Sequence, residues 1–393
     1  MPDQFLHGIE TVQIDDGIRP IRTARSSVIG IVGTAPDADE GAFPYDKPIL
    51  ITGPRMAATL GAAGTLLDAY NAAYAQGVNM MVIVRVEEGA DAPETLAAVA
   101  GTAADQTGAF ALLLANNLTG QTPRLLGAPG FTAPSGGVAS PVTANLLIVA
   151  TRTRAIVVAD GPNTTEAEAI LSRETYGSDR LYIVDPAVSV FDTVTAAYVI
   201  RPASAFVLGV ISRMDNDKGF WWSPSNQLIS GIAGTARPIT FAISSAETEA
   251  NRLNEQSITT IIRHEGFRIW GNRTTASDPL WAFLPVRRTA DMVYESIEQG
   301  LFWAMDRPFS KQLLLDIRDG VQGYLNELKA RGAILGGKVW LDPELNTETT
   351  LKAGKLYLDF DIEPPAPLEH LTFRAHRNGA YYEELVSSVA AAS

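Results

Sequence analysis

The feature that most constrains this fold is a repeated alternation of short apolar runs and helical patterns between residues 26 and 214. Most of the runs are continuously apolar, which is typical of strands covered on both faces of a sheet. Strands that alternate with helices predict a largely parallel sheet. The predicted strands are Ser27–Gly33, Val78–Val86, Arg124–Ala128, Ala155–Ala159 and Leu181–Val184.

Start and stop signals define the helices between these strands. Gly77 follows a segment rich in Leu and Ala, as the residue after a helix often does. Pro93 stands near the first position of the next helix, and Ser140 is the expected N-cap of another. Helices are therefore predicted over residues 64–76, 93–104, 142–153, 165–174 and 202–214.

The last third of the chain has a different pattern, in which strands and helices are grouped rather than alternating. Two long amphipathic helices are predicted, Ala290–Asp306 and Ser310–Ala330. The predicted strands around them are Ile258–Arg263, Phe267–Trp270, Trp281–Arg287, Ala333–Leu341, Lys355–Ile362 and Leu371–His376.

Each end of the chain carries a strand candidate without a partner nearby. Residues 8–14 alternate apolar and polar side chains, as a half-buried strand does. The polar connector 15–25 that follows has no core of its own. Near the other end, Asn378-Gly379 is a two-residue turn signal, and Tyr381–Val389 is an apolar strand candidate. A single terminal strand has to pair with something else.

These patterns predict an α/β domain followed by an α+β domain, with an extended β-strand arm at each terminus. The predicted divisions are an N-terminal arm and linker over 1–25, an α/β domain over 26–250, an α+β domain over 251–376 and a C-terminal arm over 377–393.

Motifs for catalysis are missing from the sequence. It contains no G-x-x-x-x-G-K-[ST], no G-x-S-x-G and no H-E-x-x-H. Gly30-Ile31-Val32-Gly33 lacks the third glycine of a dinucleotide loop and is not followed by a helix start. With no cysteine, thiolate nucleophiles and thiolate metal sites are excluded. We therefore expect no catalytic, cofactor or metal site.

Charge and hydropathy limit the classes of partner that this chain can bind. The 31 basic and 44 acidic side chains give a net charge of −13, which argues against direct binding to nucleic acid. No apolar stretch reaches the roughly 18 residues that a spanning helix needs. The first ten residues do not resemble a secretory signal. We expect assembly in a reducing cytoplasm and no insertion into a membrane.

Trp221 and Trp222 stand next to each other in a segment without regular pattern. Two adjacent tryptophans are costly to expose to water. They indicate either a wedge buried between domains or a subunit interface, and the sequence does not choose between the two.

Several separated motifs resemble the tail sheath proteins of contractile phages and R-type pyocins. They occur in the order expected for that family, and the resemblance extends from Phe5-Leu6-His7-Gly8 to near the C-terminus. The motifs are Thr122-Pro123-Arg124-Leu125-Leu126, Asp160-Gly161-Pro162-Asn163, Gly219-Phe220-Trp221-Trp222-Ser223-Pro224-Ser225-Asn226, Gly231-Ile232-Ala233-Gly234-Thr235-Ala236-Arg237-Pro238 and Arg268-Ile269-Trp270-Gly271-Asn272-Arg273-Thr274.

The resemblance implies a structural subunit of a contractile tail sheath, in a virion or phage-tail-like particle assembled in the bacterial host cytoplasm. Such subunits stack as six-fold rings in a helix around a tail tube, with the C-terminal domain inward and the α/β domain outward. The implied partners are sister subunits, the tail tube protein, and baseplate and tail terminator proteins. Contraction then drives the tube through the target envelope.

The resemblance also implies that the terminal arms add strands to the inner-domain sheets of neighbouring subunits, which is β-augmentation. The expected arm anchors are Ile9, Val12, Ile14, Tyr382, Leu385 and Val386. The expected hinges are Asp15, Gly17, Pro20, Asn378 and Gly379. The expected tube-facing helix is 310–330 with its following residue, and its basic side chains are Lys311, Arg318, Lys329 and Arg331.

Two other classes remain open at this point. The chain could be a tail or capsid component that does not contract, or an α/β binding module of another kind. It could also be an α/β enzyme whose site carries no familiar motif, although the missing phosphate and nucleophile motifs weigh against this.

Overall fold

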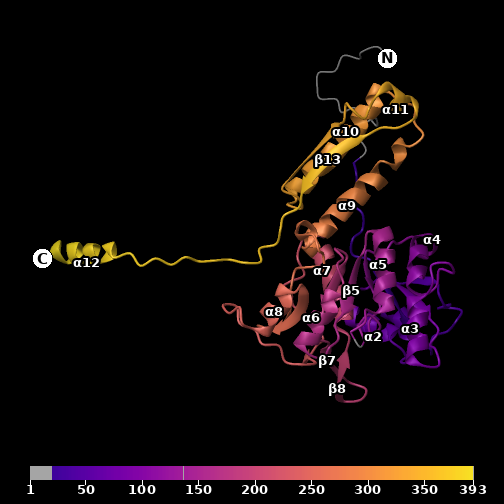
Figure 1. Ribbon diagram of the computed structural model, residues 1–393, viewed down its shortest axis with the longest axis horizontal. Coiled ribbons are helices and arrows are strands. Elements are labelled where there is room, and N and C mark those ends of the chain that lie inside the picture. The colour runs from indigo at the N-terminus through magenta and orange to yellow at the C-terminus, as the bar shows by residue number, and fades with distance from the viewer. Residues whose placement is uncertain (1–19, 136, 393) are drawn as a thin grey trace, which may run out of the picture.

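The computed structural model describes residues 20–135 and 137–392. Figure 1 shows three parts: an α/β body, a small domain joined to it through helix α9, and a long C-terminal segment that leads away from both and ends in helix α12. We call residues 26–283 the body, residues 292–363 the small domain and residues 364–392 the C-terminal segment.

An eight-stranded sheet forms the centre of the body, in the order β11-β10-β6-β5-β4-β1-β3-β2. Its interior pairs are parallel, as predicted, and β1 has Met81 on one side of Ile29 and Leu125 on the other. The outermost pairs are antiparallel. The strands are β1 (Ile29–Thr34), β2 (Pro48–Ile51), β3 (Met81–Val86), β4 (Leu125–Gly127), β5 (Ile156–Asp160), β6 (Leu181–Val184), β10 (Ile258–Arg263) and β11 (Phe267–Trp270).

Helices cover both faces of this sheet, so two apolar cores form, one on each face. This explains why the strands are continuously apolar. The Ser140 hydroxyl accepts a hydrogen bond from the Val142 amide at 3.2 Å, which confirms the predicted N-cap. The helices of the body are α1 (Pro54–Ala57), α2 (Leu66–Tyr74), α3 (Ala92–Ala100), α4 (Ala115–Thr119), α5 (Pro141–Thr153), α6 (Glu166–Glu174), α7 (Ala203–Asp217) and α8 (Glu249–Glu255), with 3-10 turns η1 (Ala58–Leu60), η2 (Gly108–Leu114) and η3 (Pro279–Trp281).

A second, three-stranded sheet extends the body at the end away from the small domain (Figure 1). Its order is β8-β7-β9, and all its pairs are antiparallel. The strands are β7 (Val188–Asp192), β8 (Ala197–Arg201) and β9 (Gly234–Thr235).

The predicted division between residues 250 and 251 is wrong. Strand β10 pairs in parallel with β6, and β11 pairs with β10, so the large sheet continues to Trp270. The apolar pattern located both strands correctly. It carries no information on which sheet a strand joins, because backbone pairing is set by tertiary contacts.

The strand predicted at Trp281–Arg287 is also wrong. The 3-10 turn η3 ends at Trp281, and helix α9 (Leu284–Gly300) begins three residues later. Pro285 occupies the first turn of α9, where its fixed φ and missing N–H are tolerated. Helix α9 therefore begins before the predicted Ala290 and ends before Asp306.

The small domain packs the second half of α9 and helix α10 (Lys311–Ala330) against a two-stranded antiparallel sheet of β12 (Gly336–Leu341) and β13 (Leu358–Glu363). The Ser310 hydroxyl caps α10, accepting from the Leu313 amide at 3.1 Å. The turn η4 (Phe302–Ala304) and helix α11 (Glu348–Lys352) complete the domain. Its core is separate from the two cores of the body.

The C-terminal segment differs from its prediction in two ways. Residues 371–376 pair with no strand in the described part of the chain. Residues predicted as the strand Tyr381–Val389 form helix α12 (Ala380–Ala390) instead. Apolar residues at 382, 385, 386 and 389 follow helical spacing, and the Ala, Glu and Leu residues among them favour a helix.

The predicted two-residue turn at Asn378-Gly379 is likewise corrected. Gly379 has φ −69° and ψ −17°, whereas a type I′ turn requires positive φ. The Asn378 side-chain oxygen accepts a hydrogen bond from the Ala380 amide at 3.0 Å. These two residues therefore start α12.

Candidate assembly interface

Two buried aspartates lie at the carboxyl ends of β5 and β6, where an enzyme of this architecture often places its site. One oxygen of Asp160 accepts from the Ser204 amide at 2.8 Å, and the other accepts from the hydroxyls of Ser204 at 2.7 Å and Thr132 at 3.2 Å. Burial raises the pKa of Asp160. Its hydrogen bonds tie β5 to α7, so this carboxyl serves the fold.

The second aspartate has a similar role. Asp185 accepts from the Asn163 amide at 2.8 Å and forms an ion pair with Arg237. Burial raises the pKa of Asp185, against the lowering effect of that guanidinium. The Asp160-Gly161-Pro162-Asn163 motif is therefore a loop fixed at both ends by buried carboxyls.

Other signs of small-molecule chemistry are also missing from the described residues. Within 20–135 and 137–392, no three His, Asp or Glu side chains come close enough to hold a metal ion. Over the same residues no helix has the length and apolar character to cross a membrane. A polar hollow beside Arg124 and Glu295 lies at the junction of the body and the small domain, where these two side chains pair with each other.

Helix α9 joins the body to the small domain through a series of ion pairs. The Arg180 guanidinium binds both oxygens of Asp291, at 2.7 and 2.9 Å. Arg288 pairs with the buried Asp215 of α7 and donates to the Ser26 carbonyl at 3.2 Å. Buried pairs of this kind fix geometry, because separating them leaves an unpaired buried charge. These contacts fix the first half of α9 on the body.

Farther along α9, two glutamates form ion pairs with arginines of the body, one buried and the other more exposed. Glu295 pairs with Arg124, and burial raises the pKa of the Glu295 carboxyl. Glu298 binds Arg154 at 2.5 and 2.6 Å in a more exposed position, and this hydrogen bonding lowers the pKa of Glu298.

The first described residues of the chain run along the other side of α9. The Ala24 amide donates to the Ser296 hydroxyl at 2.9 Å, and the Tyr324 hydroxyl lies 3.4 Å from that of Thr23. Ile21 is only 4 % exposed, inside the small-domain core. The connector was predicted to have no core of its own, and its residue Ile21 lies instead in the core of the small domain, while Pro20 just before it is exposed.

The adjacent tryptophans have separate environments. Trp221 packs edge-to-face on Phe220, against the small-domain core, and Arg331 lies 5.2 Å over its ring. Trp222 is nearly half exposed, and the Lys218 ammonium lies 4.8 Å over its ring. Trp221 is thus a wedge between the body and the small domain.

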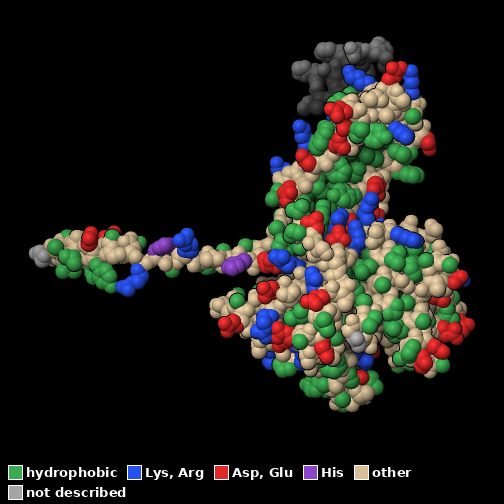
Figure 2. Space-filling view, in the orientation of Figure 1, with side chains coloured by type: hydrophobic (Ala, Val, Ile, Leu, Met, Phe, Trp, Pro, Cys, Tyr) green, Lys and Arg blue, Asp and Glu red, His purple; other side chains and the backbone are tan. Residues whose placement is uncertain are grey.

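The small domain has an incomplete sheet. Strands β12 and β13 pair only with each other among the described residues, so each has one open edge. Leu358, Phe360 and Ile362 of β13 are only partly buried against the core, although they are its apolar side chains. Figure 2 shows hydrophobic side chains gathered on this face of the small domain. An open edge beside partly exposed apolar surface is able to accept an added strand.

The C-terminal segment has the properties of such a strand. From Leu368 to Ala392 every described residue is exposed. Leu371 and Phe373 are two apart, so an extended backbone places them on one face, and Phe373 is 86 % exposed. The segment is held at its base by Glu369, which binds Arg273 of the body at 2.6 Å.

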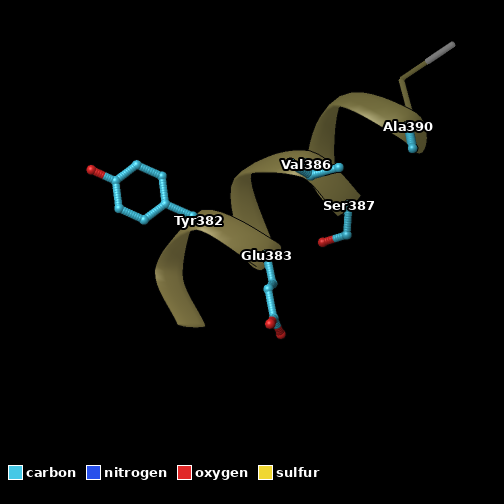
Figure 3. A pocket seen from close by; sticks show the side chains of 5 residues that line it. All are labelled: Tyr382, Glu383, Val386, Ser387 and Ala390. Atoms are coloured by element: carbon cyan, nitrogen blue, oxygen red, sulfur yellow. The ribbon is translucent and has the colours of Figure 1, made fainter. Parts of the chain in front are cut away.

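Helix α12 brings together the three anchors predicted for the C-terminal arm, although as a helix and not as a strand. Tyr382, Leu385 and Val386 have the spacing i, i+3 and i+4, which puts them on one face. In Figure 3, Glu383 and Ser387 point in a different direction from Tyr382. The hollow that Tyr382, Glu383 and Ser387 line is formed by α12 alone and so has no opposite wall.

The basic side chains predicted to face a tube lie on or next to α10. Lys311, Arg318 and Lys329 are spaced at 7 and 11 residues, so they share one face of the helix. Arg318 pairs with its neighbour Asp319 at 2.7 Å. Arg331 lies past the helix end and contacts Trp221, away from that face.

The remaining predicted residues lie outside the described part of the chain. They are the N-terminal anchors Ile9, Val12 and Ile14 and the hinges Asp15 and Gly17.

Comparison with known families decides the identity. Residues 102–275 match the phage tail sheath protein central domain, and residues 276–377 match the phage tail sheath C-terminal domain. The chain belongs to the phage tail sheath protein family. It is a structural subunit of a contractile tail sheath, a component of phage tails and related particles.

Individual relatives of this sheath protein match over nearly their whole length. A putative prophage major tail sheath protein of Pseudomonas aeruginosa (strain UCBPP-PA14) is 38% identical over 97% of this chain and 99% of its own. The tail sheath protein of Escherichia phage P2 is 36% identical over 98% of each. The contracted helical sheath of the anti-feeding prophage has the same fold, with TM-score 0.72 at 19% identity, covering 95% of this chain and 100% of that one.

The boundary between the two family domains agrees with the place where the large sheet ends. The C-terminal family domain begins at residue 276, after β11 closes the large sheet at Trp270. Sequence reasoning missed the ion pairs along α9 and the helix α12. Helical spacing at 382, 385, 386 and 389 was the signal for the second; nothing local signals the first.

Proposed function

We propose that this sheath subunit polymerises helically around a tail tube by lending strands to its neighbours, and that the sheath then shortens to drive the tube through a target envelope. The proposal rests on two features that occur together in one chain and that each lack a partner. The small domain has a two-stranded sheet with open edges, and the C-terminal segment has an extended stretch with no partner.

The chemistry of the two features is complementary. An added strand bonds to an open edge through its main chain, while alternate side chains fix the register. Leu371 and Phe373 would cover the partly buried Leu358, Phe360 and Ile362. A contact between two different surfaces of one chain does not close on itself and so generates a filament, as a sheath requires. The N-terminal anchors Ile9, Val12 and Ile14 supply the second lent strand in this proposal.

Motion in this proposal takes place at the arms. Helix α9 holds body and small domain together by buried ion pairs, so they move as one unit. The hinges are then Asp15, Gly17 and Pro20 at one end, and Asn378 and Gly379 before α12 at the other. Shortening needs no catalysis and no cofactor, because a trapped extended state releases free energy as new subunit surface is buried.

The tube contact in this proposal lies on α10, with the small domain inward and the body outward. Lys311, Arg318 and Lys329 share a face there, whereas Arg331, which lies over the Trp221 ring, is not part of this set. Exposed charged contacts are weak and sensitive to salt, which suits an interface that has to release. Baseplate and tail terminator proteins would contact the two ends of the sheath.

Electron microscopy of the purified chain, alone and with a co-expressed tube protein, tests the proposal. We expect hollow helical tubes or ring stacks. A variant ending at residue 370, which keeps the Glu369–Arg273 pair and removes, among the described residues, only exposed ones, should keep the unfolding temperature of the full chain and form no tubes. Dispersed monomers from the full chain under assembly-promoting salt would refute the proposal, and so would tubes from the truncated variant.

A further inference from the structure

Helix α12 has an apolar face with nothing of its own chain against it. Tyr381, Tyr382, Leu385, Val386 and Val389 are all at least 59 % exposed and fall within one side of the helix. Isolated helices shorter than about 12–15 residues are marginal in water, and α12 has 11 residues. Its stability therefore depends on a surface that covers this face.

The connection of α12 to residues 371–376, which form the lent strand in the proposed function, limits where that surface lies. Strand β13 has six residues, the same number as 371–376, and antiparallel pairing is the commoner arrangement. In antiparallel pairing, residue 376 lies beside Leu358 at the start of β13. Only residues 377–379 then separate it from α12, a reach of roughly 10 Å.

The start of β13 adjoins an apolar loop. Leu358 packs against a small cluster that contains Ala304 and Leu313. Residues 302–309, which we call the 302–309 loop, connect α9 to α10 at this end of the small domain. Phe302 is 78 % exposed and Met305 is 61 % exposed.

Helix α12 and the 302–309 loop also carry charges of opposite sign. Helix α12 contains Glu383 and Glu384 and no basic residue. The 302–309 loop presents Arg307, whose guanidinium lies 4.7 Å over the Trp303 ring and is exposed. Asp306 is the one acidic residue in the loop.

We propose that α12 docks through Leu385 and its apolar neighbours onto the 302–309 loop of a second copy of this chain, with Arg307 of that copy beside Glu384. This rests on the proposed strand exchange and goes beyond it, because it assigns a receiving surface to the terminal helix. Each C-terminal segment thus holds its neighbour twice, first by a strand and then by a helix.

Cysteine cross-linking tests the contact directly, because the chain has no cysteine of its own. The double variant Met305→Cys/Leu385→Cys is assembled into tubes and then oxidised. We expect a ladder of covalent multimers on a denaturing gel, since a disulfide needs Cα atoms within about 7 Å. The matched control is Met305→Cys/Ser387→Cys, whose second site lies on the polar side of α12 (Figure 3), and it should give no ladder.

The outcomes separate this inference from the proposed function. Failure of the unsubstituted full chain to form tubes under the same conditions refutes both. Tubes without a ladder, equal ladders from both variants, or cross-linked monomer alone refute only the docking of α12. As a second measurement, Arg307→Glu and Glu384→Arg should each lower tube yield at least several-fold, and the two together should restore it. No recovery in the double variant counts against the pairing.

Discussion

Ile21 lies directly on Gly300, the last residue of α9. A Cβ added at Gly300 would stand 2.7 Å from Cγ1 and 2.8 Å from Cγ2 of Ile21, closer than real side chains approach. The N-terminal segment thus reaches the small-domain core through a gap that only glycine leaves. The segment that leads to the N-terminal arm is fixed at this point.

Gly300→Ala should therefore destabilise the chain, although alanine is normally the better helix residue. Overpacking of this kind costs about 1–3 kcal/mol in the free energy of unfolding. Denaturant unfolding measures the loss, and proteolysis after Arg22 or Arg25 should become faster. The control is Gly320→Ala in α10, where a Cβ meets nothing within 4 Å, and it should stabilise by about 0.5–1 kcal/mol. The same sign for both variants would contradict the packing described.

The buried pair of Arg288 and Asp215 should dominate the stability of the α9 junction. Arg288→Met leaves Asp215, whose side chain is 1 % exposed, as an unpaired buried charge. Breaking such a pair costs about 3–5 kcal/mol. Arg252→Met, which breaks the exposed pair with Glu166, should cost far less, because solvent screens an exposed ion pair. Chemical denaturation of both variants makes the comparison, and equal losses would show that burial does not decide the difference.

Acid should weaken the pair of Arg154 and Glu298. The hydrogen bond from Arg154 lowers the pKa of Glu298 in the folded chain. The stability that this pair adds is therefore fully present above the pKa of Glu298 in the unfolded chain, about 4.3, and is lost as the pH falls through the lower pKa of the folded chain. Glu298→Gln should cost about 0.2–1 kcal/mol at pH 7, because the pair is exposed.

The difference between Glu298→Gln and the unsubstituted chain should shrink as the pH falls through the lowered pKa of Glu298, because protonation leaves both side chains neutral. Unfolding curves from pH 7 to pH 3 measure it. A difference that stays constant over this range would show that the charge of Glu298 is not responsible.

Phe373 should matter for assembly and not for folding. It is 86 % exposed in the free chain, so Phe373→Asp should leave the unfolding temperature unchanged. In the proposed strand exchange its face covers apolar surface of a neighbour, so the substitution should abolish tubes. Thr372→Asp changes the opposite face of the same strand and should reduce tube formation far less. Sedimentation after assembly measures both variants, and equal assembly would rule out this register.

Much of the body was predictable from local pattern. The strand Leu181–Val184 was predicted with its observed ends, because four consecutive apolar residues between polar turns are typical of a short buried strand. Ser140 was recognised as a cap because its hydroxyl satisfies an amide that the helix leaves free. The family resemblance was likewise readable from its motifs, and the family domains confirm it.

Other features followed only from the tertiary structure. Arg124 and Glu295 are 171 positions apart, and no periodicity connects them. The sequence of strand β10 would look the same whether the strand joined the large sheet or a second one. An apolar pattern indicates that a strand is buried, but it does not indicate which strand lies beside it. The sequence by itself determined the elements, the lack of familiar catalytic motifs and the family. Tertiary packing decided the domain boundary, the junction along α9, the Ile21–Gly300 contact and the open sheet, because burial and backbone pairing join residues distant in the chain.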